Sequence, residues 1–103
     1  MEKVIRDGNV AVLYSPGYGA GWQSWGAPIE AVFHPELVDW VEKGKLEPIE
    51  DVMSRTFPNA DFYIGGASDL EIEWIPQGTA FRITEYDGSE AIEILGEMEF
   101  IIA

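Results

Sequence analysis

The fold is decided by the stretch from residue 70 to residue 95, which reads LEIEWIPQGTAFRITEYDGSEAIEIL. Apolar and polar residues alternate through it in three runs, as in strands that have one buried face and one face in solvent. Gly78 and Gly88 separate the runs, in Gln-Gly and Asp-Gly pairs that suit two-residue hairpin turns. A fourth alternating run, Met98 to Ile102, follows Gly96. The pattern predicts an antiparallel meander of four strands.

Two-residue turns at Gly78 and Gly88 fix the register of the first three strands of the meander. One face of the sheet is then apolar throughout, and a slip by one residue would mix the two faces. On the other face, Arg82 lies between Glu73 and Glu93 and neutralises both carboxylates, so we give Arg82 a structural role. The apolar face has two rows of cross-strand neighbours, which are Trp74, Phe81 and Ile94, and Ile72, Ile83 and Ile92.

Two amphipathic helices are predicted ahead of the meander. Apolar residues recur at helical spacing over residues 35–43 and again from Pro48 to Phe57, and a Gly or Pro follows each run. These helices cover the apolar face of the sheet, so residues 1–103 form a single α+β domain of four to five strands and two short helices. A buried strand from Asn9 to Tyr14 joins the sheet at an edge or pairs near Tyr63-Ile64, and the sequence leaves both arrangements open.

The composition excludes several classes of protein. Nineteen acidic and six basic residues give a net charge of -13, which repels the phosphates of nucleic acids and of anionic lipids. The chain has no cysteine, which excludes disulfides, thiolate metal sites and cysteine nucleophiles. No stretch is apolar for long enough to cross a bilayer, and the first residues lack the apolar core of a signal peptide. We expect a cytoplasmic protein that binds neither nucleic acid nor membrane.

Residues 15–26, SPGYGAGWQSWG, combine four glycines with three large aromatic residues in one loop. Glycine lets the backbone approach a ligand closely, and aromatic rings offer flat surfaces on which a base can stack. The opposite interpretation is that a tryptophan closes one end of the core and the glycines form a tight Ω-loop. We expect binding, by stacking of Tyr18, Trp22 and Trp25 and through the amides near Gly19 and Gly21.

A second glycine-rich segment, Gly65 and Gly66 followed by Ser68 and Asp69, precedes the meander. Two adjacent glycines permit positive φ or close backbone approach, and the polar side chains after them bond a ligand or cap a turn. We expect all four residues to share one ligand pocket with the first loop. An interface between copies of the chain is one place for such a pocket, which leaves a homo-oligomer open.

No set of residues in the sequence identifies an enzyme or a metal site. His34 is the only histidine, and no second ligand stands at a metal-binding spacing from it. Serine, histidine and aspartate do not occur together in a recognisable catalytic context. Glu71 and Glu73 leave a paired-carboxylate acid/base or divalent-cation site open. We expect no catalytic residue, no metal and no cofactor, and hence a protein that binds its ligand without converting it.

Three stretches carry a resemblance to known proteins. They are residues 10–22 (VAVLYSPGYGAGW), 63–67 (YIGGA) and 72–88 (IEWIPQGTAFRITEYDG). They resemble a family of small uncharacterised proteins encoded by tailed bacteriophages, and the resemblance extends over most of the chain. The resemblance implies an accessory role against host defence, either as a sponge for nucleotide immune signals or as a blocker of a defence protein. It assigns no activity to individual residues.

Two functions follow from these patterns. The first is a non-enzymatic phage accessory (anti-defence) protein whose glycine loops bind and sequester a small nucleotide-like ligand. The second is an acidic inhibitor of the anti-CRISPR or anti-restriction type, whose glutamate-rich face mimics nucleic acid and occupies a basic host protein. A structural phage component is a third possibility. A pocket lined by Trp22 or Trp25 favours the first function, whereas buried tryptophans and a flat acidic face favour the second.

Overall fold

The computed structural model describes residues 2–17, 21–58 and 65–95, and it shows an α+β fold. Within these ranges, no helix combines the length and apolar character that crossing a bilayer requires. In chain order the elements are β1 (Ile5–Arg6), β2 (Asn9–Tyr14), the 3-10 helices η1 (Gln23–Trp25) and η2 (Ile29–Phe33), α1 (Pro35–Glu42), α2 (Ile49–Thr56), the 3-10 helix η3 (Gly65–Asp69), β3 (Glu71–Pro76), β4 (Ala80–Tyr86) and β5 (Ser89–Leu95).

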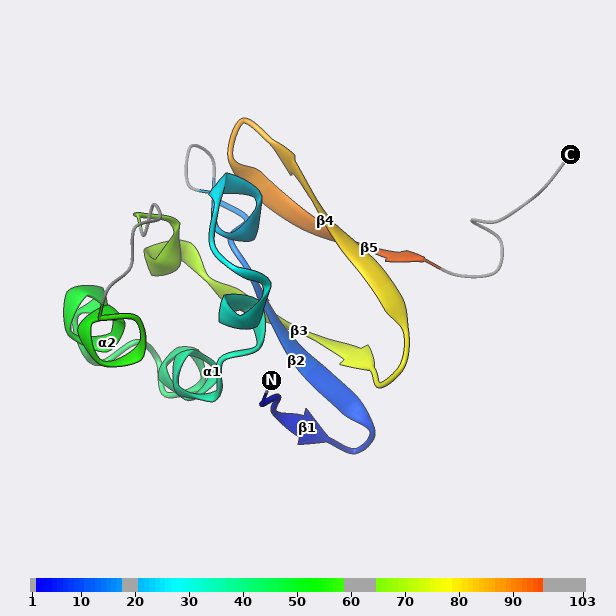
Figure 1. The fold of residues 1–103 in the computed structure, drawn as a ribbon, viewed down its shortest axis with the longest axis horizontal. Coiled ribbons are helices and arrows are strands. Elements are labelled where there is room, and N and C mark those ends of the chain that lie inside the picture. Colours follow the sequence, from blue (N-terminus) through cyan, green and yellow to red (C-terminus); the bar gives the residue numbers. More distant parts are fainter. Residues whose placement is uncertain (1, 18–20, 59–64, 96–103) are drawn as a thin grey trace, which may run out of the picture.

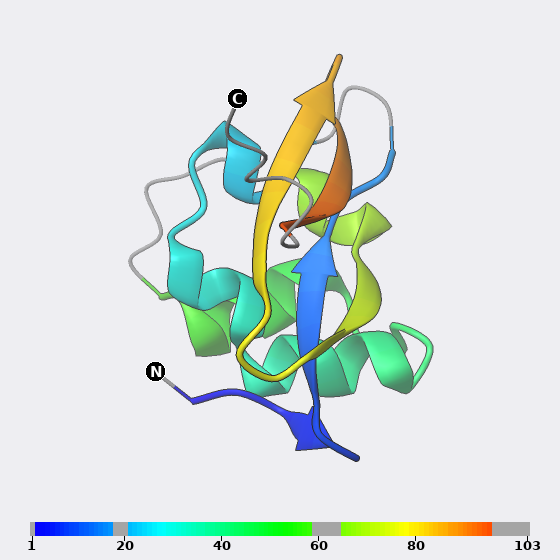
Figure 2. The ribbon, with the colours of Figure 1, turned by 90° about the vertical axis from the view of Figure 1, so that its right-hand side faces the viewer.

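The strands form two antiparallel sheets. The first has the order β1-β2-β3, and the second is the β4–β5 hairpin. Helices α1 and α2 lie on one side of the β2–β3 pair and the hairpin lies on the other side (Figure 1). Figure 2 shows the hairpin in front of β2 after a 90° turn. β2 therefore lies between a helical layer and a second layer of sheet.

This central position explains the composition of β2. Every residue from Val10 to Leu13 is buried, as expected for a strand with both faces covered. The two layers also meet beside it, because the Phe33 ring of η2 packs edge-on against the Phe81 ring of β4, with centroids 6.2 Å apart. Each large aliphatic side chain buried here stabilises the fold by about 1.5–3 kcal/mol. The expectation that this strand lies at a sheet edge is therefore wrong, and Tyr63-Ile64 fall outside the described residues.

β3 pairs with β2 and not with β4, which corrects the predicted meander. Trp74 lies opposite Ala11, and Glu73 lies opposite Val12. The predicted position of Glu73 opposite Arg82 is therefore wrong. β2 is six residues long and apolar, so it offers β3 a full-length partner. Periodicity shows that a segment is a strand but does not choose its partner among strands of similar length.

The turn after β3 forms where the sequence places it, although the strands on either side of it belong to different sheets. The Thr79 amide donates to the Pro76 carbonyl oxygen over 3.0 Å, and Gly78 has a φ of +86°, which favours glycine. The Gln77 amide donates to the Gly8 carbonyl oxygen over 2.8 Å. That bond fastens the turn to the β1–β2 connection and directs the chain into the second sheet.

The β4–β5 hairpin confirms the other half of the predicted register. Asp87 and Gly88 have φ values of 51° and 84°, the left-handed conformations that a type I′ turn requires at both central positions. Arg82 donates to Glu93 over 2.8 Å across the hairpin. The predicted strand from Met98 to Ile102 lies outside the described residues. The predicted apolar pairs that the hairpin contains are Phe81 with Ile94 and Ile83 with Ile92.

Both predicted helices are present, and each ends within one residue of its expected bounds. The His34 ring nitrogen Nδ1 accepts a hydrogen bond from the Glu36 amide over 3.2 Å, so His34 caps α1 and Pro35 occupies the first helical position. Pro48 is the N-cap residue of α2 and not its first helical residue as predicted. Acidic residues in the first turn of each helix complement the helix dipole.

Candidate functional site

The glycine-rich loop is tied to the β4–β5 hairpin by one buried carboxylate. Glu90, in β5, has only 2% of its surface exposed. Its Oε1 accepts a hydrogen bond from the Ser15 amide over 2.9 Å. Its Oε2 accepts from the amides of Trp22 and Ser24, over 3.0 and 2.8 Å, and from the Ser24 hydroxyl over 2.6 Å. Four donors therefore compensate the burial of this charge.

The described part of the loop thus presents amides to an anion, but this anion is a carboxylate of the protein itself and not a ligand. Convergent backbone amides form anion-binding concavities that suit phosphate as well as carboxylate. The amides of Ser15, Trp22 and Ser24 bond the Glu90 carboxylate, so a phosphate group would have to displace it. In this conformation these amides have a structural role.

Sequence reasoning missed Glu90, although its position in the strand carries a signal. Successive side chains in a strand point to opposite faces, so Glu90 shares a face with Ile92 and Ile94. A carboxylate in phase with the apolar side of a hairpin indicates a buried charge with dedicated donors. The segment that supplies those donors is distant in sequence and was not identifiable from periodicity.

Trp22 is part of the core, which corrects the prediction that its ring stacks on a ligand. Its side chain has 0% exposure and belongs to the same buried cluster as Leu13 and Leu70. Stacking needs an accessible ring face, and a fully buried ring offers none. Burial of a large aromatic side chain is favourable, and the hydrogen bond from its amide to Glu90 fixes the loop over the core. The alternative interpretation, a tryptophan that closes the core, holds for Trp22.

The two glycine-rich segments do lie together, as expected for a shared site. The Ser15 hydroxyl donates to the buried Gly66 carbonyl oxygen over 2.9 Å. A Cβ atom placed on Gly17 would stand 2.6 Å from Asp69 Oδ2, so a larger residue there would displace the Asp69 side chain from its close approach to the loop. The contacts that join the two segments are therefore made by the protein's own atoms.

Of the remaining predicted binding residues, the structure describes some and leaves others outside the described part. Gly21 is buried beside Trp22, and the Ser68 carbonyl oxygen accepts a hydrogen bond from Lys45 Nζ over 2.8 Å. Gly65 begins η3. The structure does not describe Tyr18, Gly19 or the side chain of Trp25, and ligand binding by these residues stays a prediction.

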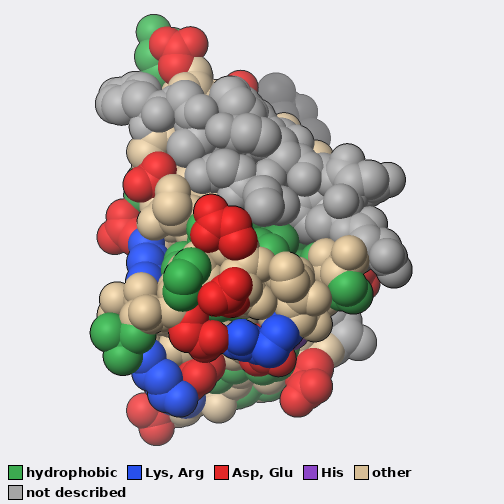
Figure 3. All heavy atoms as spheres, turned by 90° about the vertical axis from the view of Figure 1, so that its left-hand side faces the viewer, with side chains coloured by type: hydrophobic (Ala, Val, Ile, Leu, Met, Phe, Trp, Pro, Cys, Tyr) green, Lys and Arg blue, Asp and Glu red, His purple; other side chains and the backbone are tan. Residues whose placement is uncertain are grey.

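All six cations of the chain lie within the described residues, and each contacts a carboxylate, a carbonyl oxygen or an aromatic ring of the same chain. The ion pairs are Arg6 with Glu42, Lys43 with Asp39, Arg55 with Glu36 and Glu47, and Arg82 with Glu93. Lys45 bonds the Ser68 carbonyl oxygen, and Lys3 lies over the Phe33 ring at 4.6 Å. Figure 3 shows basic side chains beside acidic ones on one face of the molecule.

One hollow of about 480 Å³ lies where the first residues of the chain, η2, α1 and the end of α2 meet. Half-buried His34, Pro35, Thr56 and Phe57 line it, and the ring centroids of His34 and Phe57 are 5.3 Å apart. Three exposed carboxylates complete the lining and belong to Glu2, Glu30 and Glu36. Acidic side chains and rings thus surround a hollow that no cation lines.

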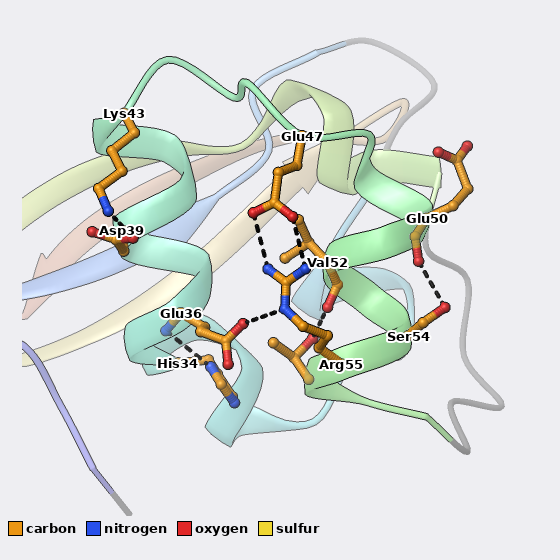
Figure 4. Close-up of polar contacts among 10 residues, drawn as sticks. His34, Glu36, Asp39, Lys43, Glu47, Glu50, Val52, Ser54 and Arg55 are labelled. Atoms are coloured by element: carbon orange, nitrogen blue, oxygen red, sulfur yellow. Dashed lines mark hydrogen bonds and ion pairs between the residues drawn. The ribbon is translucent and has the colours of Figure 1, made fainter.

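A second hollow, of about 250 Å³, lies between α1 and α2 and differs in charge. Arg55 donates to Glu36 over 3.1 Å and forms a two-pronged pair with Glu47 over 2.7 and 3.0 Å (Figure 4). The hydrogen bond from Arg55 lowers the pKa of Glu47, and the two carboxylates raise the pKa of Arg55. Lys43 also lines this hollow, beside the exposed Leu46. The acidic groups here already have cationic partners.

Glu71 and Glu73 are both exposed on β3, beside Tyr14 of β2. Burial raises the pKa of the Tyr14 phenol, and the charges of the two glutamates raise it further. Among the residues that the structure describes, no three His, Cys, Asp or Glu side chains are arranged to hold a metal ion. The two carboxylates therefore act on Tyr14 as a local negative field.

Comparison with protein-family models, with curated proteins and with solved structures gave no match. The chemistry that this surface supports therefore rests on its own geometry.

Proposed function

We propose that the protein is a non-enzymatic inhibitor that binds a basic partner protein through its acidic surface. The observation that carries this proposal is the distribution of charge. Every cation is engaged within the chain, whereas the carboxylates of Glu30, Glu71 and Glu73 are exposed and form no ion pair with any described cation. Such a surface attracts basic partners and repels anions over about 10 Å at moderate salt.

The glycine-rich loop supports this choice over sequestration of a nucleotide. Trp22 is buried, and the amides of Ser15, Trp22 and Ser24 bond Glu90. An incoming phosphate would meet occupied donors as well as a net charge of -13. Sequestration through Tyr18, Gly19 and Trp25 remains the alternative prediction.

A groove that normally binds nucleic acid is the surface that an acidic protein of this size fits best. Such grooves are lined with lysine and arginine that contact phosphates at regular spacing, and exposed carboxylates can occupy the same positions. The resemblance to tailed-phage proteins makes a bacterial nucleic-acid-binding protein the favoured partner.

The test is affinity capture from a nuclease-treated bacterial lysate, followed by competition between DNA or RNA and this protein for the purified partner. We expect a captured protein that elutes between about 50 and about 500 mM salt and binds either nucleic acid or this protein, not both. Capture should weaken for the combined Glu71→Gln and Glu73→Gln variant. Simultaneous binding of nucleic acid would contradict mimicry, and release of an intact nucleotide from the heated protein would favour sequestration.

A further inference from the structure

The larger hollow combines acidic charge, aromatic surface and concave shape, and no lysine or arginine lines it. Its half-buried wall contains the His34 and Phe57 rings and Pro35, and the exposed carboxylates of Glu2 and Glu30 stand around it. Neither of these two glutamates forms an ion pair with a described cation. The smaller hollow differs, because Lys43 and Arg55 line it.

We propose that this hollow receives an arginine side chain of the basic partner, an inference that rests on the proposed function. A guanidinium group is planar, stacks on aromatic rings and forms two parallel hydrogen bonds with a carboxylate. The hollow offers both kinds of contact, the rings of His34 and Phe57 and the carboxylates of Glu2 and Glu30. Its volume of about 480 Å³ is large enough to admit an arginine side chain.

The lining of this hollow favours a cation over an anion, because it contains three glutamates and neither lysine nor arginine. Nδ1 of His34 accepts a hydrogen bond from the Glu36 amide, so in this geometry that nitrogen does not donate to an anion in the hollow. Glu36 is bonded to Arg55, which leaves Glu2 and Glu30 as the groups that pair with the incoming guanidinium.

Lysine fits the same charge less well. Its ammonium group is compact and strongly hydrated, and it does not stack as a plane on an aromatic ring. The hollow should therefore prefer arginine to lysine, whereas a merely diffuse acidic surface would bind the two alike. This difference separates a defined arginine site from general charge attraction.

The test is titration of the isotope-labelled protein with two probes, N-acetyl-arginine amide and N-acetyl-lysine amide, followed by NMR. We expect the arginine probe to shift the resonances of His34, Glu30 and Phe57 and to bind several-fold more tightly than the lysine probe. Glu30→Gln should weaken the arginine probe about threefold, while Glu73→Gln, with the same change of charge on β3, should leave it unchanged. Phe57→Leu, if folded, should remove the preference for arginine.

Equal binding of both probes, or equal weakening by Glu30→Gln and Glu73→Gln, would overturn the arginine site. Capture of the partner by the variants distinguishes failure of the arginine site from failure of the proposed function. If Glu30→Gln and Phe57→Leu capture the partner as well as the unmodified protein does, the acidic inhibitor stands and the arginine site is wrong. If no partner is captured, the proposed function fails even where the arginine probe binds.

Discussion

At the scale of single residues, Glu90 shows how one side chain occupies the hydrogen-bond donors of three loop residues, Ser15, Trp22 and Ser24. Its carboxylate uses the amides that would otherwise be free to bind a phosphate. The burial of Glu90 could have been predicted from the sequence, because Glu90 lies on the same strand face as Ile92 and Ile94. Its hydrogen-bond partners could not have been predicted, since Ser15 and Ser24 lie more than sixty positions away in the sequence.

Replacing Glu90 by glutamine should lower the free energy of unfolding by about 1–3 kcal/mol, because an amide has one acceptor oxygen where the carboxylate has two. Its NH2 group would then face the N–H donors of the loop. Urea denaturation measures the change, with Glu73→Gln as a control of equal charge that should stay within about 0.5 kcal/mol of the unmodified protein. Equal stability of the two variants would refute the structural role of Glu90.

Tyr14 provides a pH prediction at the same scale. Its pKa is raised by burial first and then by Glu71 and Glu73, so the folded protein keeps the phenol protonated after the unfolded chain has lost the proton. The free energy of unfolding should therefore fall as pH rises through about 10 and level off above the folded pKa. The titration of Tyr14 is isolated by subtracting the absorbance titration curve of the Tyr14→Phe variant from that of the unmodified protein. Glu73→Gln should lower the midpoint, and an unchanged midpoint would contradict the proposed field.

At the scale of elements, the sequence predicts helices, strands and turns, which depend on nearby residues, but it does not predict which strands pair with each other. Both helices follow from their apolar spacing and caps, and the β4–β5 register follows from the Asp87-Gly88 turn. The pairing of β3 with β2 could not be predicted, because it depends on two segments about sixty residues apart. Trp22 was misassigned for a related reason. A tryptophan in a glycine-rich loop gives the same sequence pattern whether the loop folds over a core or stays exposed.

The pairing of β2 with β3 can be tested by cross-linking, because the chain contains no cysteine. Tyr14 and Glu71 are direct partners, and partners in antiparallel strands have Cα separations that a disulfide can bridge. The variant with Tyr14→Cys and Glu71→Cys should form an intramolecular disulfide under mild oxidation, which mass spectrometry detects. A second variant carries Glu73→Cys and Arg82→Cys. If this variant forms the disulfide and the variant with Tyr14→Cys and Glu71→Cys does not, β3 pairs with β4 as in the predicted meander, and the pairing with β2 is wrong.

At the scale of the whole molecule, the structure separates a stabilised interior from an acidic exterior. The glycine-rich loop, η3 and the hairpin are joined by hydrogen bonds that involve Ser15, Gly66 and Glu90. The cations are engaged locally, so the excess of negative charge is available to a partner. The proposed function places binding on the acidic surface, whereas the described part of the glycine-rich loop makes contacts that stabilise the fold.

The most direct measurement is the dissociation constant of the captured partner at several salt concentrations, for the unmodified protein and for Trp25→Ala. We predict that binding weakens steadily as salt increases, and that Trp25→Ala changes the dissociation constant by less than about twofold, because acidic side chains and not the loop supply the contacts. Binding that is insensitive to salt and is lost in Trp25→Ala would show that the glycine-rich loop carries the function, and would contradict the account.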